Sequence, residues 1–142
     1  MDMTNEPTTL VLLDATHPDG ESALRLLDDC DSHIALMVLL SGRSSSALRD
    51  FAHGEDIDID SAAWFYLDQV VARSVFSARV TQTIVARGPS AIAEITDQAM
   101  TTTLRRVLLP SSITRFEPKA AQRLAARIAS PVLVASESAL VA

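Results

Sequence analysis

The stretch LRRVLLPSSITRFEPKAAQRLAARIASPVLVAS, residues 104–136, decides the fold of this chain. It begins with a short apolar run that ends at Leu109 and a polar turn at Ser111 and Ser112. Residues 118–129 then have apolar side chains at helical spacing, and a second apolar run, Val132–Ala135, follows. A strand, a helix and a strand joined by short turns form a βαβ unit. Such units place ligand sites at the carboxyl ends of their strands.

The rest of the chain continues this alternation. Apolar runs at 9–13 and 33–40 predict strands buried on both faces, and polar residues alternating with apolar ones at 78–86 predict a strand at a sheet edge. The other helices are predicted at 20–30, 47–53, 61–76 and from Gly88 to Ala99. The order favours an α/β fold with three layers, α/β/α, around an open parallel five-stranded sheet, in a single domain over residues 1–142.

The predicted helices and strands lead to three local predictions. Pro89 and Pro118 are expected at the first position of their helices, where the missing N–H is not needed. Cys30 lies on the apolar stripe of the helix predicted at 20–30, where we expect a small buried thiol. Asp14, which follows the first strand, is expected in an exposed turn.

Composition excludes several classes of function. The formal net charge is −6 and the isoelectric point is near 4.9, whereas nucleic-acid binding needs a clustered basic face, so no nucleic-acid partner is expected. The longest apolar runs are far too short to span a bilayer, and the polar, acidic amino end is unlike a signal peptide. We therefore expect a cytoplasmic protein with no membrane contact. A single cysteine excludes a disulfide within the chain.

Neither a metal site nor a catalytic set is predicted. Asp56, Asp58 and Asp60 have the alternate spacing of a calcium loop, but Ser61 stands at the required glycine position and Leu67 at that of the required glutamate. The three histidines are dispersed and match no zinc spacing. Because no acid, base and nucleophile converge, we do not expect an enzyme. Action on a small metabolite is the third alternative.

The chain resembles the universal stress protein (UspA-like) family, whose fold is also described as adenine nucleotide alpha hydrolase-like. Three motifs carry the resemblance: LVLLD at 10–14 ahead of a helix, Gly88-Pro89 with Ile92, and AAQRLA at 120–125 running into SPVLV at 130–134. Together they span nearly all of residues 8–136. The resemblance implies the strand order 3-2-1-4-5, and a dimer in which two last strands pair antiparallel.

One departure from the family matters for the cofactor. Nucleotide-binding members carry glycines after the fourth strand, and backbone amides there hold the phosphates. Residues 109–119 contain no glycine, although such a cradle needs a close approach of backbone and positive φ angles. Pro118 supplies no N–H, and Glu117 would add a like charge beside the phosphates. We therefore expect no cofactor and disfavour ATP.

A ligand crevice is predicted at the point where the strand order reverses. By topology it would be lined by residues that follow the first, second and fourth strands: Asp14, Ala15, Thr16, Ser41, Gly42, Arg43, Pro110, Ser111 and Ser112. Turn hydroxyls and Asp14 also have a purely structural alternative, because such side chains often bond the backbone of their own turn.

The sequence thus predicts a universal stress protein-like, non-ATP-binding protein of stress response or regulation. It would act as a dimer, through an unidentified protein partner or small ligand. The main alternative is adenine-nucleotide binding in a remodelled crevice at Asp14 and Ser111. The homodimer is expected through Val132–Ala135, because this apolar edge strand has none of the charges that normally protect an exposed edge.

Overall fold

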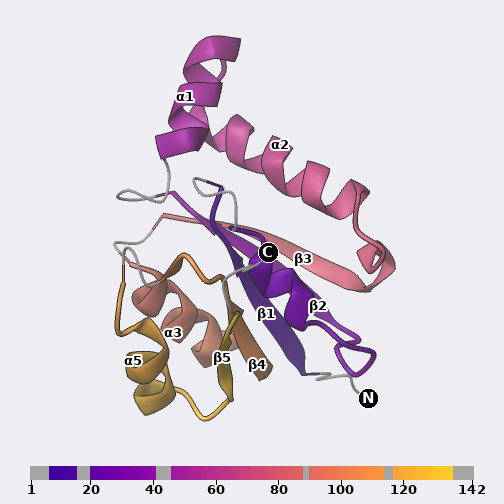
Figure 1. The fold of residues 1–142 in the computed structure, drawn as a ribbon, viewed down its shortest axis with the longest axis vertical. Helices are drawn as coiled ribbons and strands as arrows, with labels where there is room; N and C mark the ends of the chain where they lie inside the picture. Colours follow the sequence, from indigo (N-terminus) through magenta and orange to yellow (C-terminus); the bar gives the residue numbers. More distant parts are fainter. Residues whose placement is uncertain (1–6, 16–19, 41–45, 88–89, 114–116, 136–142) are drawn as a thin grey trace, which may run out of the picture.

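The computed structural model describes residues 7–15, 20–40, 46–87, 90–113 and 117–135 (Figure 1). Its centre is one sheet of five strands, which are β1 (Thr8–Leu13), β2 (Ile34–Leu39), β3 (Val80–Ala86), β4 (Leu104–Leu109) and β5 (Val132–Val134). All neighbouring strands pair in parallel, in the order β3-β2-β1-β4-β5. The predicted fold class and strand order are confirmed, and the strand at 78–86 is an edge strand as expected.

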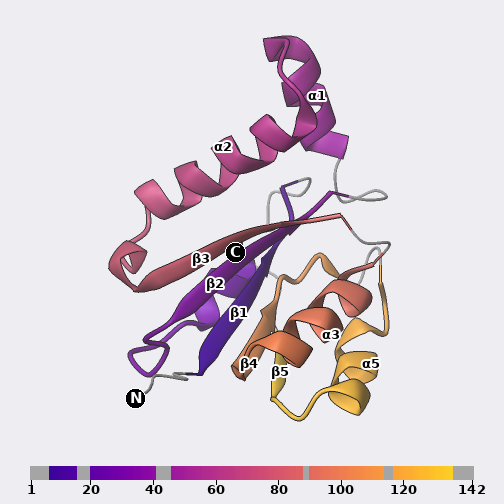
Figure 2. The same ribbon diagram turned by 180° about the vertical axis from the view of Figure 1, so that it is seen from behind.

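Helices cover both faces of this sheet (Figures 1 and 2). One face carries α1 (Ser46–Glu55), α2 (Ile59–Ala72) and the short 3₁₀ helix η1 (Ser22–Leu26). The opposite face carries α3 (Ala91–Thr101) and α5 (Ala120–Arg127). A second 3₁₀ turn, η3 (Ser77–Arg79), leads into β3. Among the described residues, every helix falls short of the length and apolar character needed to traverse a bilayer.

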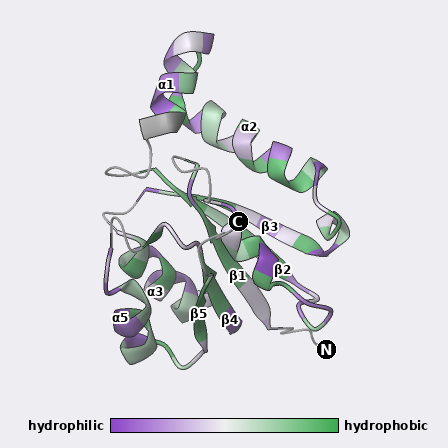
Figure 3. Cartoon of the chain, in the orientation of Figure 1, coloured by the Kyte–Doolittle hydropathy of each residue, from purple (hydrophilic) through white to green (hydrophobic). Residues whose placement is uncertain are grey.

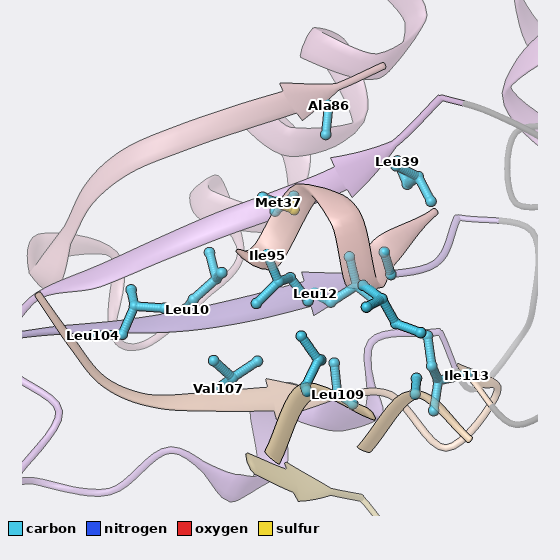
Figure 4. Close-up of a cluster of buried hydrophobic side chains, with 14 of the residues drawn as sticks. Leu10, Leu12, Met37, Leu39, Ala86, Ile95, Leu104, Val107, Leu109 and Ile113 are labelled. Atoms are coloured by element: carbon cyan, nitrogen blue, oxygen red, sulfur yellow. The ribbon is translucent and has the colours of Figure 1, made fainter. Parts of the chain in front are cut away.

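Two hydrophobic cores lie on either side of the sheet because side chains alternate along each strand. In β1, Leu10 and Leu12 point into the core under α3 and α5, whereas Val11 and Leu13 point toward α2. Figure 4 shows the first of these cores, with Ile95 of α3 among the strand side chains. In Figure 3 the central strands are mainly hydrophobic, and α1 and α5 alternate hydrophobic with hydrophilic bands.

Two helices begin later than their prolines predict. The Ser90 hydroxyl oxygen accepts a hydrogen bond from the Ala93 N–H at 3.1 Å, so Ser90 is the N-cap and α3 starts at Ala91. At α5 the N-cap is Lys119, one residue after Pro118. The prediction that Pro89 and Pro118 occupy first helical positions is therefore wrong. Before α5 the chain makes a turn at Pro118 and Lys119, and before α3 the N-cap Ser90 is extended.

The helix predicted at 20–30 is also wrong, since only the five residues of η1 are helical there. Two carboxylates bond the backbone after η1: Asp28 Oδ1 accepts from the Cys30 N–H at 2.8 Å, and Asp31 Oδ2 accepts from the Asp28 N–H at 2.9 Å. Aspartate side chains that bond nearby amides compete with the helical pattern. Because no helix continues to Cys30, its side chain is exposed, and the prediction of a buried thiol fails.

Asp31 also forms the centre of a buried ion pair at the amino ends of β1 and β4. Its fully buried carboxylate accepts from Arg106 Nε at 3.1 Å, from Arg106 Nη2 at 2.5 Å and from the Thr9 hydroxyl at 2.5 Å. Burial alone would raise the pKa of Asp31, but these hydrogen bonds and the one from Asp28 outweigh it and lower the pKa to about 2. The pair therefore joins β1, β4 and the loop before β2.

Candidate ligand crevice

Some of the residues predicted to line a crevice come together at the carboxyl ends of β1 and β4. The sheet reverses its strand order here, since β2 lies on one side of β1 and β4 on the other. Asp14 follows β1, and Ser111 and Ser112 follow β4. The Ser112 hydroxyl donates to Asp14 Oδ2 at 2.8 Å, so residues 98 positions apart in the sequence are in direct contact.

Asp14 is only 3% exposed, which contradicts the expectation of an exposed turn residue. The backbone folds back over this position, because the Asp14 N–H donates to the Gly20 carbonyl at 3.0 Å. Ser111 and Ser112 are also buried. A buried carboxylate requires a hydrogen-bond donor to offset its desolvation, and the Ser112 hydroxyl is such a donor. Contact between Asp14 and Ser112 thus has a structural role whether or not a ligand enters.

Ser22 of η1 completes this cluster and was not predicted. Its hydroxyl oxygen accepts from the Ser111 N–H at 2.8 Å, and its Oγ lies 3.4 Å from Ser111 Oγ. The Ser22 side chain is fully buried between the ends of β1 and β4. This serine lies within the helix predicted at 20–30, and a hydrogen bond across 89 positions leaves no local signal in the sequence. The cluster therefore consists of one carboxylate and three hydroxyls.

Glu21, next to Ser22, fixes η1 against α2. Arg73 donates to its two carboxylate oxygens at 2.9 and 3.0 Å, and the Tyr66 hydroxyl donates to Oε2 at 3.2 Å. Burial, followed by the negative charge of Glu21, raises the pKa of the Tyr66 phenol, so the hydroxyl remains a donor. The position of Ser22 in the crevice thus depends on a contact with α2.

Glu117 takes a position that the sequence did not predict. Its carboxylate accepts hydrogen bonds from the Ala91 N–H at 2.6 Å and from the Ile92 N–H at 3.4 Å, at the amino end of α3. Free N–H groups and the helix dipole make this end attractive to anions. A cavity of about 330 Å³ lies beside it, lined by Ile92, Glu117, Pro118, Lys119 and Arg123. An anion supplied by the chain itself therefore caps α3.

The remaining predicted crevice residues divide into two groups. Pro110 is buried and Ala15 half-buried at the ends of β4 and β1. Thr16 and the loop residues Ser41, Gly42 and Arg43 lie outside the described residues, so their place in the crevice stays a prediction. The described members of the predicted set lie at the ends of β1 and β4, beside Ser22 of η1.

Two members of the acidic series after α1, Asp58 and Asp60, have structural partners. Asp58 is the N-cap of α2, where its Oδ1 accepts from the Ser61 N–H at 2.7 Å. Asp60 forms an ion pair with Arg87. Within the described ranges, no group of three or more His, Cys, Asp or Glu residues is arranged to hold a metal ion. The pattern that resembles a calcium loop thus begins a helix.

Comparisons with known proteins relate the chain to two solved structures. It is similar to the hypothetical protein PH0823, with 17% identity, a TM-score of 0.64, and coverage of 94% of this chain and 98% of that one. It is similar to the hypothetical protein MJ0577, whose biochemical function was assigned on the basis of its structure, with 14% identity, a TM-score of 0.63 and the same coverage. No protein-family model and no curated protein sequence matches the chain. These likenesses show that the chain shares the α/β fold of PH0823 and MJ0577 over nearly its whole length.

Proposed function

We propose that this chain is a universal stress protein-like regulatory protein that does not bind ATP, and that it acts as a homodimer through a protein partner or a small ligand. A cytoplasmic role in stress response is part of this proposal. The observation that carries the proposal, in its statement about ATP, is the position of the Glu117 carboxylate at the amino end of α3.

Glu117 bears on ATP because phosphates and carboxylates compete for the same backbone N–H groups. Its oxygens already accept from Ala91 and Ile92, and a phosphate at this place would meet a negative charge. The turn between β4 and α5 has no glycine at 109–119, so its backbone lacks the freedom of a phosphate-binding loop. Contact between Asp14 and Ser112 further supports a crevice that is closed by its own hydrogen bonds.

β5 supports the proposed homodimer. In the described residues β5 pairs with β4 alone, and its outer edge is open. Leu133 and Val134 are large apolar residues exposed on this strand. Unprotected apolar edge strands favour pairing with another strand, and antiparallel pairing of two copies of Val132–Ala135 would satisfy both edges about a two-fold axis.

The ATP proposal is tested by thermal unfolding with 1 mM ATP and magnesium. Ligand at about 100 times its dissociation constant stabilises a protein by about 2.7 kcal/mol, so binding at about 10 μM would raise Tm by several degrees. We expect no increase. Such an increase, abolished by Asp14→Ala and not by the exposed-site control Val75→Ser, would refute the proposal in favour of nucleotide binding at Asp14 and Ser111.

A further inference from the structure

An exposed aromatic surface lies on the helical hairpin formed by α1 and α2. We call it the α1–α2 surface, and its apolar members are Phe51, Ile57, Trp64 and Phe65. Figure 1 shows α1 at one end of α2, projecting beyond the sheet. Phe51 is 41% exposed, Trp64 44% and Phe65 50%. Phe51 and Phe65 are in contact, and Ile57 and Trp64 are exposed on the same hairpin. Contiguous exposed apolar side chains mark interaction sites more often than isolated ones do.

Packing between the two helices orders Phe51 and Phe65. The rings of Phe51 and Phe65 stack across the hairpin with centroids 5.7 Å apart and an interplanar angle of 12°. The other side of α1 and α2 is buried in the core between these helices and the sheet, with the side chains of Leu48, Ala52, Ala63 and Leu67. The aromatic side chains are thus held outward on helices whose inner faces are anchored.

Carboxylates accompany the aromatic residues at helical spacing. Glu55 follows Phe51 by four residues on α1, and Asp68 follows Trp64 by four on α2. Residues four apart lie on the same face of a helix. Asp50 and Asp56 are also exposed on this hairpin, and residues 50–72 contain no Lys or Arg. Among the described residues, Arg49 precedes this segment and Arg73 follows it. Arg73 is paired with Glu21, and Arg87 is paired with Asp60. The α1–α2 surface is therefore apolar and negative.

Charge decides among the possible occupants. A second copy in a two-fold contact would place the same carboxylates against each other. The chain's own ends, 1–6 and 136–142, carry acidic residues and no Lys or Arg, so they have the same sign. Anionic lipid and nucleic acid are repelled as well. A positively charged protein segment remains, and its cations can lie over aromatic rings while pairing with the adjacent carboxylates.

We propose that the α1–α2 surface binds a basic amphipathic helix of a partner protein, with aliphatic side chains against Phe51, Trp64 and Phe65 and Lys or Arg toward Glu55 and Asp68. Helical segments with one apolar face commonly dock on exposed apolar helical surfaces. This inference rests on the part of the proposed function in which the chain acts through a partner. It is independent of whether the crevice takes a nucleotide.

Trp64 allows a direct test because it is the only tryptophan of the chain. The probe is a synthetic amphipathic peptide of Leu and Lys, about 18 residues or five helical turns long. We expect a saturable blue shift of Trp64 emission at micromolar peptide, weakened by salt. A peptide of the same pattern with Glu in place of Lys should give at least tenfold weaker binding. Equal binding of both peptides, or no shift with the Lys peptide up to about 1 mM, would overturn the proposal.

Variants separate the two kinds of contact. Phe51→Ser with Phe65→Ser removes the stacked rings, and Glu55→Lys with Asp68→Lys reverses the charges. Each pair should weaken binding of the Lys peptide at least tenfold. Val75→Ser is the matched control, because Val75 is fully exposed outside the surface. The variant Glu55→Lys with Asp68→Lys keeps the stacked rings of Phe51 and Phe65. It therefore still tests the proposal if the variant without these rings fails to fold. Unchanged binding in the charge pair would refute the proposal.

Two further outcomes identify a different occupant. A blue shift on raising protein concentration without peptide, together with a dimer mass that the charge pair abolishes, would show that a second copy covers the surface. A shift with vesicles of anionic lipid would show a membrane contact. Either result would overturn the inference, whereas ATP binding would refute the proposed function and leave this inference intact.

Discussion

Replacing Asp31 tests the buried ion pair at the amino ends of β1 and β4. The pKa of this carboxyl falls from 3.8 to about 2 in the folded chain. A tenfold change in an acid dissociation constant corresponds to ~1.4 kcal/mol, so the charged Asp31 stabilises the fold by about 2 kcal/mol at neutral pH. Asp31→Asn should lose about this amount. Both substitutions remove the counter-charge of Arg106. Asp31→Ala also removes the hydrogen-bond acceptor of Arg106 and Thr9 and should lose about 3–5 kcal/mol.

Dependence on pH makes this prediction specific. The carboxyl binds its proton more weakly in the folded chain, so the unfolded chain takes up the proton first as pH falls. Stabilisation is complete above about pH 5 and is lost as pH falls through 3.8 toward 2. Asp31→Asn has no carboxyl at this site and should lose correspondingly less stability over this range.

Urea unfolding at a series of pH values measures both effects. Asp29→Asn is the matched control, since it removes the same charge from an exposed neighbour, and it should change the free energy of unfolding by less than about 0.5 kcal/mol. If Asp31→Asn were as stable as Asp29→Asn at pH 7, or if the two lost stability equally between pH 5 and 2, the reasoning about this ion pair would be refuted.

Three other substitutions test the crevice, the α3 cap and the sheet edge. Asp14→Ala should lower the free energy of unfolding by about 1–3 kcal/mol in urea, because it leaves the Ser112 hydroxyl buried without its acceptor; a loss below 0.5 kcal/mol would contradict this. Glu117→Ala should cost about 1 kcal/mol through loss of the cap on α3, and unchanged thermal unfolding would show that the cap is unimportant. Val134→Pro removes an N–H from β5 and should give monomer or aggregate by light scattering; a wild-type monomer at micromolar concentration would exclude the dimer itself.

Strands of this fold were predictable because their signal is local. The runs that became β1 and β2 are buried along their whole length, as parallel strands covered on both faces require. In β4 the apolar run Val107–Leu109 is buried in the same way, whereas β3 has the exposed polar residues of an edge strand. Meeting of Asp14 with Ser111 and Ser112 was also predictable, because parallel strands bring their carboxyl ends to one side of the sheet.

Hydrogen bonds between distant residues account for the errors. Asp28 and Asp31 bond the backbone after η1, where the helix was predicted to continue. The position of Asp31 depends on its ion pair with Arg106, 75 positions away. Burial of Asp14 depends on the backbone at Gly20, and Ser22 reaches Ser111 across 89 positions. Helical spacing of apolar side chains says nothing about these contacts, so the exposed Cys30 was predicted as buried.

The two edges of the sheet differ, and this difference limits how far strand addition can extend. On β3, Thr81 and Gln82 are exposed polar residues, whereas β5 exposes Leu133 and Val134. A sheet with two adhesive edges can add copies indefinitely and form a fibre. If only the β5 edge can pair with another strand, then pairing of β5 with β5 occupies that edge in both copies, and no edge remains for a third copy. Growth by this route would stop at ten strands, leaving a β3 edge at each end of a finite particle.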